Sequence, residues 1–391
     1  MTTMLLSQNL PPATGGSSRW LWEIYRRMPR GHTRIAAGSH PGDVEFDRTH
    51  NLPVHRLPLS FDDWGLFSVG GFRDYARADR AIERLVFRSN VHTIHCGRML
   101  PEGYLAWRMN KRHGIPYAVY VHGEELNSIA TSRQLSWMTA RVLAEATTVI
   151  ANCRNTADIL TRRWQVRVDQ AALLHPGVDT HAFCPADRCL ATRRRLGWGD
   201  RPVILTVARL QKRKGHDQMI RALRSICGAM PDVLYAVAGD GPERQSLHEL
   251  AKAQGVERHV QWMGRIDDAD MVAAYQQCDL FVLPNREVRG DFEGFGMVLL
   301  EAQSCGKPVV AGNSGGTRET MIEDQTGRLV NVDDTDALSS VVLDLMNDSA
   351  RRSDMGAAAR QWIVDHFDWQ VLAAEAQAIF SQRFVAPRAA A

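Results

Sequence analysis

The sequence predicts an α/β protein with two doubly wound domains, each built on a parallel sheet covered by helices. The chain has 391 residues, enough for two domains of ordinary size. Short apolar, β-branched runs alternate with amphipathic helical stretches along its whole length, which is typical of βαβ units. Hydrophobic residues make up 45% and charged residues 23% of the chain, a composition typical of folded globular proteins.

The strand-like runs fall into two groups, separated by a stretch in which the alternation stops. The first group covers residues 4–8, 92–95, 117–121 and 147–151. The second group covers residues 203–208, 233–238, 260–263, 280–283 and 308–311, with helical patterns at 216–227, 243–254, 270–278 and 336–346 between and after them. The alternation stops around residues 176–196, where Pro176, Gly177 and Pro185 are found. We therefore expect one domain at residues 1–185 and a second at residues 186–368.

Charge and cysteine content exclude several classes of protein. The 47 Lys and Arg residues nearly balance 44 Asp and Glu residues, for a net charge of +3, so we expect no nucleic-acid partner. The seven cysteines are scattered and form no C-x-x-C pair, which favours a reducing compartment over disulfides or a zinc site.

Residues 1–10 do not have the pattern of a signal peptide, and no apolar run reaches the roughly 18 residues of a membrane span. These features predict a cytoplasmic protein.

The strongest chemical motif is a pair of glutamates, Glu293 and Glu301, around the start of a helix. Eight residues of helix separate two side chains by about 12 Å, which suits two hydroxyl-bearing groups on either side of a diphosphate. Backbone N–H groups near Gly294 and Gly296 would receive the phosphates at the helix N-terminus. The alternative is a loop glutamate followed by a surface glutamate. The apolar surroundings of Glu301 argue against that alternative.

A second motif is the basic run 209–215, directly after the strand-like run 203–208. Because α/β proteins bind ligands beyond the carboxyl ends of their strands, Arg209 and Lys214 could neutralise a leaving phosphate there. A solvated charged loop is the alternative. The later turn Gly239-Asp-Gly241 contains G-x-G but has Arg244 in place of a third glycine, so it predicts a tight strand-to-helix turn better than an NAD site.

The first half of the chain contains weaker signals. Gly15 and Gly16 follow the opening strand and would let the backbone approach a ligand, although a plain turn fits as well. His122 ends the strand-like run 117–121 and is either structural or part of a cleft. Asp268-Ala-Asp270 matches a metal-binding D-x-D pattern, but its place before a helix favours a helix cap. Since there is also no His/Cys cluster, we expect no metal site.

One segment of the first half suits a lipid surface. Aromatic residues in the loop 61–72 are followed by arginines at helical spacing, a pattern that suits docking on anionic lipid. Acidic residues interleave with them, which fits an ordinary solvated helix equally well. The residues concerned are Phe61, Trp64, Phe67, Phe72, Arg73, Arg77, Arg80, Arg84 and Arg88, with Asp74, Asp79 and Glu83 between.

Taken in this order, the motifs resemble family 4 of the retaining nucleotide-sugar glycosyltransferases, whose fold is called GT-B. The resemblance runs from Gly15 and Gly16 through residues 176–179 to the tract 307–316, and within the family it is nearest to phosphatidylinositol and polysaccharide mannosyltransferases. It implies two Rossmann-like domains facing a central cleft. The first would lie on the acceptor side and the second would bind the nucleotide sugar. It also implies a C-terminal helix within residues 369–391 that crosses back to the N-terminal domain.

The resemblance also implies roles for individual residues. Arg209 and Lys214 would stabilise the leaving diphosphate, and Glu301 would hold the ribose hydroxyls. Glu293 would bind the sugar hydroxyls, and His122 would contact the sugar from the other domain. The full set of implied donor-binding residues is Gly15, Gly16, Gly239, Arg265, Ile266, Glu293, Gly294, Phe295, Gly296, Met297, Val298 and Glu301, with the backbone at 265–266 reading the base.

The reaction implied by the resemblance is transfer of mannose from GDP-mannose to a glycan or lipid-linked acceptor. It would retain the anomeric configuration without a covalent intermediate, and it would require no cofactor and no essential divalent metal. The expected partners are the nucleotide-sugar donor, that acceptor and an anionic membrane surface, with docking on the inner face of the cell membrane. The alternatives are a UDP-sugar transferase of polysaccharide or glycolipid synthesis, a GT-B epimerase or phosphorylase, a Rossmann dehydrogenase and a non-catalytic glycan-binding protein.

Overall fold

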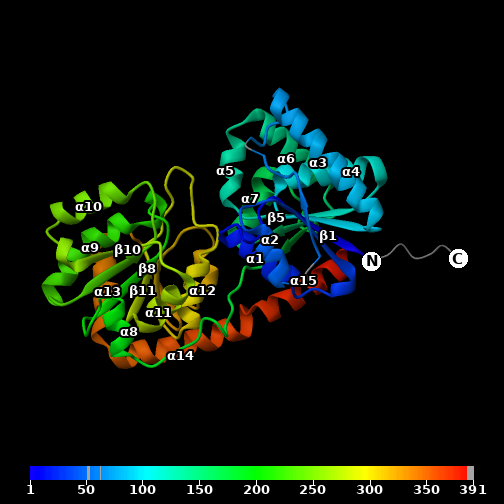
Figure 1. The fold of residues 1–391 in the computed structure, drawn as a ribbon. Coiled ribbons are helices and arrows are strands. Elements are labelled where there is room, and N and C mark those ends of the chain that lie inside the picture. Colours follow the sequence, from blue (N-terminus) through cyan, green and yellow to red (C-terminus); the bar gives the residue numbers. More distant parts are fainter. Residues whose placement is uncertain (51–52, 62, 385–391) are drawn as a thin grey trace. The chain divides into compact units, whose positions relative to one another are not determined.

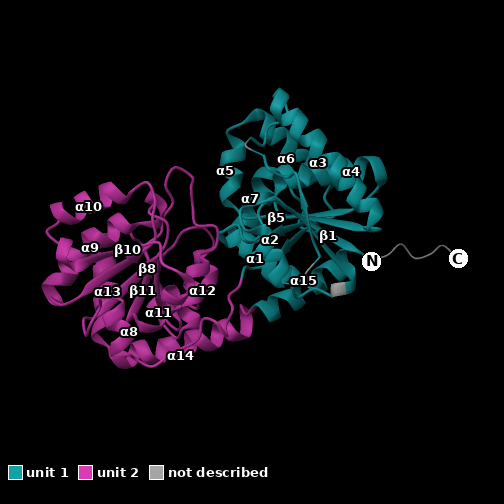
Figure 2. Ribbon diagram, in the orientation of Figure 1, with its two compact units in different colours: residues 1–176, 369–391 teal, residues 177–368 magenta. Residues whose placement is uncertain are grey.

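The computed structural model describes residues 1–50, 53–61 and 63–384 of the chain, which folds into two compact units. Unit 1 comprises Met1–Pro176 together with Trp369–Ala391, and unit 2 comprises Gly177–Asp368 (Figure 2). Each unit is a parallel sheet with helices packed against it (Figure 1). The predicted α/β class with two doubly wound domains is therefore confirmed.

Unit 1 contains, among its described residues, a seven-stranded sheet in which every pairing is parallel. In sheet order the strands are β3 (Val54–Leu57), β2 (Thr33–Gly38), β1 (Thr3–Ser7), β4 (Thr93–Cys96), β5 (Tyr117–Val121), β6 (Thr148–Ala151) and β7 (Ala171–Leu173). The helices are α1 (Gly16–Tyr25), α2 (Asp43–His50), α3 (Val69–Arg88), α4 (Tyr104–His113), α5 (Glu124–Ala130), α6 (Arg133–Glu145), α7 (Arg154–Trp164) and α15 (Trp369–Arg383). Helices α3, α4 and α6 pack in one group, and α1 packs against α15.

Unit 2 contains, in the described part of the chain, a six-stranded parallel sheet. In sheet order its strands are β10 (Val260–Gly264), β9 (Leu234–Ala238), β8 (Val203–Val207), β11 (Leu280–Leu283), β12 (Val309–Gly312) and β13 (Gly327–Val330). The helices are α8 (Leu190–Arg195), α9 (His216–Ala229), α10 (Arg244–Ala253), α11 (Asp268–Gln277), α12 (Met297–Ser304), α13 (Thr335–Asn347) and α14 (Ser349–His366). Helix α9 packs with α10 and α13, whereas α12 packs with α11 and α14.

The central strands agree with the sequence-based expectations because they are buried on both faces. The bounds of β5 and β11 match their predicted runs, and all of their residues are buried. Such strands read as continuous apolar runs. Four strands were not predicted: β2, β3, β7 and β13. Strands β3, β7 and β13 lie at sheet edges and are only partly buried, and β2 combines Thr and Arg with small residues. None of them forms a strongly apolar run.

The boundary between the units lies after Pro176 rather than after residue 185. The segment 177–185 belongs to unit 2 because its backbone is hydrogen-bonded there. The Val178 amide donates to the Phe367 carbonyl at 2.9 Å, and the Thr180 hydroxyl donates to Asp368 at 2.6 Å. The Ser304 hydroxyl donates to the Phe183 carbonyl at 2.5 Å. The prolines and glycine of this stretch thus mark the start of unit 2.

The last helix, α15, packs on unit 1 although it follows unit 2 in the chain (Figure 2). The Phe380 ring lies 4.1 Å from the His95 ring and 6.5 Å from the Tyr25 ring, between centroids. The Arg383 guanidinium donates to the Ala171 carbonyl at 3.3 Å. Residues 385–391 of the expected terminal segment lie outside the described residues.

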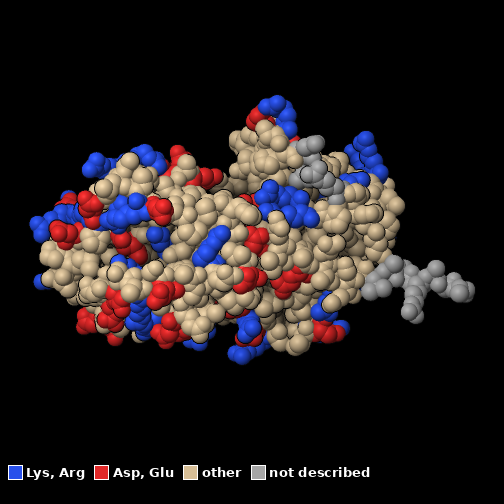
Figure 3. Space-filling view, turned by 90° about the horizontal axis from the view of Figure 1, so that it is seen from below, with Lys and Arg blue, Asp and Glu red and all other residues tan. Residues whose placement is uncertain are grey.

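The surface carries charges of both signs. On the face drawn in Figure 3, basic and acidic side chains are intermixed rather than gathered into one field of a single sign. Within the described ranges, no helix combines the length and the apolar character needed to cross a lipid bilayer.

Candidate functional site

The most strongly organised polar site of unit 2 lies at the carboxyl edge of its sheet. Strand order reverses between β8 and β11, since β9 and β10 follow on one side and β12 and β13 on the other. Ligands of doubly wound proteins bind beyond such a switch point. The loop 208–215 leaves β8 there, and the loop 284–296 leaves β11. These loops contain Arg209, Lys214 and Glu293.

Glycines hold these loops in close contact. A Cβ atom on Gly215 would lie 1.6 Å from the Pro284 carbonyl oxygen, and one on Gly315 would lie 1.8 Å from the Glu293 carbonyl oxygen. Both glycines have positive φ angles, +71° and +60°. No other residue type allows these approaches, so Gly215 fixes the loop after β8 against the loop after β11, and Gly315 fixes the segment after β12 against the backbone at Glu293.

Gly239, in the turn after β9, allows a similar close approach to the loop after β8. Its φ angle is +142°, and a Cβ atom there would lie 2.0 Å from the Ala208 carbonyl oxygen. Gly241 approaches the Leu210 carbonyl oxygen in the same way, at 2.5 Å. The Gly239-Asp-Gly241 turn therefore packs on the backbone that carries Arg209, as a tight strand-to-helix turn would.

Lys214 and Glu293 form an ion pair that joins the loops. The Lys214 ammonium lies 2.5 Å from Glu293 Oε2, and the Arg213 guanidinium donates to the same oxygen at 2.8 Å. Lys214 belongs to the 3-10 turn η3 (Lys212–Lys214), which directs it and Arg213 toward the same carboxylate. Arg213 was not singled out in the sequence, although it belongs to the basic run 209–215.

The Glu293 carboxylate is buried, with a side chain 8% exposed. Burial alone would raise its pKa, but the charges of Lys214 and Arg213 outweigh that effect and hold the pKa below its usual value. The carboxylate is thus an ionised acceptor, fixed by two cations at the edge of the sheet.

Glu301 is held separately, on helix α12. It is buried, and the Tyr275 hydroxyl from α11 donates to its Oε2 at 2.8 Å. Burial raises the pKa of Tyr275 well above its usual value, and the Glu301 charge adds to this, so the hydroxyl remains a donor. Helix α12 begins only at Met297, so Glu293 lies in the preceding loop. The two glutamates are therefore not separated by eight residues of helix, and the helical rise from which the 12 Å spacing was predicted does not apply to them.

Arg209 follows β8 and is exposed. Its guanidinium forms no ion pair with any residue that the structure describes, and its carbonyl accepts a hydrogen bond from His216 Nε2 at 3.2 Å. Burial lowers the pKa of His216 to about 4, against the effect of this hydrogen bond, so the imidazole is neutral and acts as a donor. His216 therefore fixes the backbone at Arg209 and leaves its side chain available.

The start of α12 offers backbone donors close to this site. Gly296 precedes the helix with φ +98°, no side chain caps the helix, and its first turn has no acidic residue. Gly294 is partly buried, Phe295 is buried, and Met297 and Val298 are partly buried. The first-turn N–H groups therefore present positive charge at the carboxyl edge of the sheet.

The remaining sequence candidates of unit 2 lie at α11 and β10. Arg265 is exposed and Ile266 partly exposed, in the turn after β10. Asp267 caps α11 by accepting from the Asp270 amide at 2.8 Å, and Asp268 and Asp270 lie in the first turn. Among the described residues, no group of three or more His, Cys, Asp or Glu side chains is arranged to hold a metal ion.

In unit 1, the loop that contains Gly15 and Gly16 (the glycine loop) and His122 both lie at the carboxyl edge of the sheet. Gly15 precedes α1 with φ +141°, a conformation restricted to glycine, and α1 starts at Gly16 without a side-chain cap. The Trp20 ring of α1 lies 5.4 Å from the His122 ring, between centroids. Helix α1, which begins at Gly16, therefore contacts His122 through Trp20.

His122 is buried and hydrogen-bonded. Its Nε2 donates to the Gly97 carbonyl at 2.8 Å, and its amide donates to Glu125 Oε1 at 2.9 Å. Burial lowers the pKa of His122, although the Glu125 carboxylate acts in the opposite direction. Asn152 Nδ2 donates to the His122 carbonyl at 2.7 Å, and Cys153 caps α7 by accepting from the Thr156 amide. These contacts give His122 a fixed, neutral imidazole.

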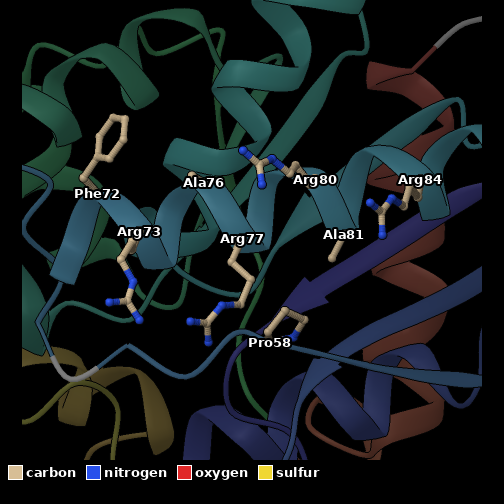
Figure 4. Close-up of a pocket in the computed structure, with 8 residues that line it drawn as sticks. All are labelled: Pro58, Phe72, Arg73, Ala76, Arg77, Arg80, Ala81 and Arg84. Carbon is tan, nitrogen blue, oxygen red and sulfur yellow. The ribbon is translucent and has the colours of Figure 1, made fainter. Parts of the chain in front are cut away.

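In the structure, the acidic and the basic side chains of α3 have different surroundings, which the sequence alone does not show. Asp79 binds Arg108 and Arg112 of α4, and Glu83 binds Arg112 and His113. Four of the five arginines of α3 instead line a groove of about 510 Å³ with Phe72 and Pro58, and Arg88 at the end of the helix is not among them (Figure 4). The four are Arg73, Arg77, Arg80 and Arg84, all exposed and without an ion pair to any described residue.

The aromatic residues before α3 do not all face the surface. Phe61 is 6% exposed and contacts Tyr75, and Trp64 packs against the core. Phe67 and Phe72 are 75% and 64% exposed. The expected aromatic surface therefore includes Phe67 and Phe72 but not Phe61 or Trp64.

Family models cover most of the chain. The model described as "Glycosyltransferase Family 4" matches residues 14–182, and the model described as "Glycosyl transferases group 1" matches residues 191–362. The first match lies in unit 1 apart from its last residues, and the second lies entirely in unit 2.

Characterised relatives align over nearly the whole chain. A GDP-mannose-dependent alpha-(1-6)-phosphatidylinositol monomannoside mannosyltransferase of Mycolicibacterium smegmatis is 31% identical over 97% of this chain and 98% of its own. The enzyme of the same name from Mycobacterium tuberculosis H37Rv is 30% identical over 95% of this chain and 96% of its own. A D-inositol 3-phosphate glycosyltransferase of Stackebrandtia nassauensis is 28% identical over 99% of this chain and 92% of its own.

Solved structures share the fold. HepE of Anabaena, solved in complex with UDP, has a TM-score of 0.80 and 21% identity over 98% of this chain and all of its own. Sucrose-phosphate synthase of Thermosynechococcus elongatus has a TM-score of 0.79 and 21% identity over 99% of this chain and all of its own. The fold is therefore GT-B. The chain belongs to glycosyltransferase family 4 and is a glycosyltransferase that uses a nucleotide sugar.

Proposed function

We propose that the protein transfers mannose from GDP-mannose to a mannosylated phosphatidylinositol or a related glycolipid, retaining the configuration at the anomeric carbon. The proposed donor and acceptor follow from the names of relatives at 30–31% identity that align over 95–97% of the chain. The observation that carries the proposal is the Lys214–Glu293 ion pair at the switch point of unit 2, because its cation would suit a diphosphate and its carboxylate would suit sugar hydroxyls.

In the proposed reaction, the bond between the sugar C1 and the diphosphate oxygen breaks, and the acceptor hydroxyl oxygen forms a bond to C1 from the same face while its proton passes to the leaving diphosphate. Negative charge develops on the leaving diphosphate. The Arg209 guanidinium and the Lys214 ammonium would stabilise that charge, which is the dominant means of catalysis when no protein nucleophile takes part. The first-turn N–H groups of α12 would add to this stabilisation. Glu301 would accept hydrogen bonds from the ribose hydroxyls, and Glu293 from the sugar hydroxyls.

The binding roles proposed in unit 1 depend on the glycine loop and His122. The N–H groups at the start of α1 would face phosphate or sugar, and His122 would contact the sugar through its carbonyl or its ring. No divalent metal enters the proposed reaction, since cationic side chains supply the neutralising charge.

A transfer assay with purified protein tests this proposal. GDP-[14C]mannose and phosphatidylinositol monomannoside are supplied in detergent, and the lipid product is separated and its anomeric linkage is determined by NMR. We expect an α-linked mannosyl product. Transfer from UDP-glucose but not from GDP-mannose would favour the UDP-sugar alternative. Transfer to inositol phosphate but not to lipid would show that the acceptor is inositol phosphate and not a glycolipid. Release of nucleotide without any transfer would contradict the proposal.

We further propose that α3 docks unit 1 on an anionic membrane, where a lipid-linked acceptor would lie. The support is the groove lined by Phe72 and four exposed arginines that form no ion pair with any described residue (Figure 4), together with the exposed side chain of Phe67 in the preceding loop. Because Asp79 and Glu83 bind arginines of α4, they do not neutralise this groove. Basic side chains near an anionic surface each contribute about 1 kcal/mol to binding, and apolar side chains add to it.

Vesicle co-sedimentation tests the docking proposal. We expect binding to phosphatidylglycerol vesicles at low salt, weaker binding at high salt, and little binding to phosphatidylcholine vesicles. The double variant Arg77→Gln/Arg84→Gln should lose most of this binding. The matched variant Arg162→Gln/Arg224→Gln, which removes exposed arginines outside α3, should retain it. Equal binding by both double variants, or no binding by the wild type, would end the docking proposal.

A further inference from the structure

Glu293 Oε2 accepts hydrogen bonds from two cations that are held differently. The Arg213 Nη1 atom donates to it at 2.8 Å, and Arg213 Nε also lies 3.4 Å from Asp291 Oδ1. Lys214 Nζ lies 2.5 Å from the same Glu293 oxygen, and Glu293 is its partner in the described part of the chain. Arg213 is therefore tied to two carboxylates and Lys214 to one.

A backbone hydrogen bond also holds Arg213 more firmly than Lys214. The Arg213 carbonyl accepts a hydrogen bond from the Arg286 amide at 2.8 Å, and the Arg286 guanidinium binds both oxygens of Asp217 at 2.9 Å. Arg213 is thus fixed to the loop after β11 by backbone and side chain together. A guanidinium serves two acceptors at once in a planar fork, whereas an ammonium is a single charge on a flexible stem. Lys214 is the cation that can change partners.

A change of partner has a consequence for Glu293. If Lys214 turned to the diphosphate of a donor, a carboxylate with an 8% exposed side chain would depend on Arg213 for its charge. Burial raises the pKa of Glu293, and the cations together lower it below its usual value. Without these cations, burial would leave the pKa of this carboxyl group raised, and a carboxyl group that takes up a proton loses acceptor capacity for sugar hydroxyls.

We propose that Arg213 is a positioning residue that keeps Glu293 ionised and in place while Lys214 binds the donor diphosphate. Arg213 then determines affinity for the sugar part of the donor and has little effect on affinity for the nucleotide diphosphate. This inference rests on the proposed function, and it extends that function by assigning the two cations of one ion-pair cluster to different parts of the donor.

Calorimetric titration of GDP and of GDP-mannose into full-length protein tests this division. We expect Arg213→Gln to bind GDP as the wild type does, while the ratio of the Kd for GDP-mannose to the Kd for GDP rises about tenfold. Lys214→Gln should weaken binding of both ligands. Lys212→Gln removes an exposed cation from the same turn η3 and should change neither value.

Arg213→Lys and the pH profile separate positioning from a general loss of structure. Arg213→Lys restores one cation at Glu293 and should recover much of the ratio. Arg213→Gln should lose GDP-mannose binding at a higher pH than the wild type when the solution is acidified, because Glu293 then has a higher pKa. An equal loss of GDP and GDP-mannose affinity, or an unchanged ratio and pH profile, would overturn the inference. If the wild type bound neither ligand, the proposed function would fail with it.

Discussion

The Lys214 Nζ atom lies 2.5 Å from Glu293 Oε2, and this ion pair joins residues 79 positions apart in the chain. It connects the loop after β8 to the loop after β11 at the point where strand order reverses. Gly215 and Gly315 allow the backbones around the pair to approach this closely. The cation and the carboxylate proposed for the donor are therefore assembled within unit 2 by itself.

The buried pair predicts a specific pH dependence of stability. Since the pKa of Glu293 is lowered in the folded state, its contribution is complete above its unfolded pKa of about 4.3 and disappears as the pH falls through the folded value. Urea unfolding at pH 7, 5, 4 and 3 should show a steeper loss of the free energy of unfolding for the wild type than for Glu293→Gln. Parallel curves for the two proteins would show that the pair contributes nothing to this dependence.

Removal of Arg209 or Glu301 should abolish most of the activity without unfolding the protein. Arg209 is exposed and has no ion pair among the described residues, so its loss leaves no buried charge without a partner. We expect Arg209→Ala and Glu301→Ala to lower transfer by about 100-fold or more, with circular dichroism spectra like those of the wild type. Lys212→Ala serves as the control from the same loop. Wild-type transfer by both site variants would refute the assignment of the site.

Tyr275→Phe should weaken donor binding and leave the chemical step largely intact. The variant removes the hydroxyl that donates to Glu301 Oε2 and keeps the shape of a buried ring. We expect the KM for the donor to rise about tenfold with a nearly unchanged kcat. Tyr117→Phe, which loses a 2.7 Å hydrogen bond to the Val142 carbonyl in unit 1, is the matched control and should leave the donor KM unchanged. A lower kcat with unchanged KM for Tyr275→Phe would contradict this role.

Gly239→Ala should be far more harmful than Gly255→Ala. Both positions have positive φ angles, +142° and +69°, but only the alanine Cβ at 239 would meet a backbone oxygen, at 2.0 Å. We expect Gly255→Ala to lower the free energy of unfolding by about 1 kcal/mol and Gly239→Ala by about 3 kcal/mol or more. Because the clash moves the backbone next to Arg209, Gly239→Ala should also reduce transfer. Equal losses of stability would show that the loops can separate at little cost.

Much of the fold could be predicted because its central strands are buried on both faces. Strands β5 and β11 have the predicted bounds, since a continuous apolar run is sufficient to identify them. Strands β3, β7 and β13 were missed because edge strands are only partly buried and have a weaker pattern. The boundary after Pro176 depends on hydrogen bonds such as Val178 to Phe367, which join residues distant in the chain.

The sequence predicted the motifs of the site one by one, but it did not predict the contacts between them. Lys214 and Glu293 were both singled out, but their ion pair depends on the packing of two loops and has no local signal. Arg213 belongs to the same basic run, and only the turn η3 directs it to Glu293. Tyr275 lies on α11, outside every motif, and an aromatic residue in an amphipathic helix is usually read as core. The sequence alone does not show that acidic residues of α3 bind side chains of α4, because α4 is distant in the chain from those residues.

In the proposed function, the carboxyl edge of the unit 2 sheet binds a nucleotide sugar through Lys214, Glu293 and Glu301. Thermal unfolding of the wild type and of Glu301→Ala in the presence of GDP-mannose, UDP-glucose or ADP-glucose tests it directly, since a ligand that binds the folded state raises the Tm. We expect a rise in Tm with GDP-mannose for the wild type and little or no rise for Glu301→Ala. An unchanged Tm of the wild type with every sugar nucleotide, or equal rises for both proteins, would contradict it.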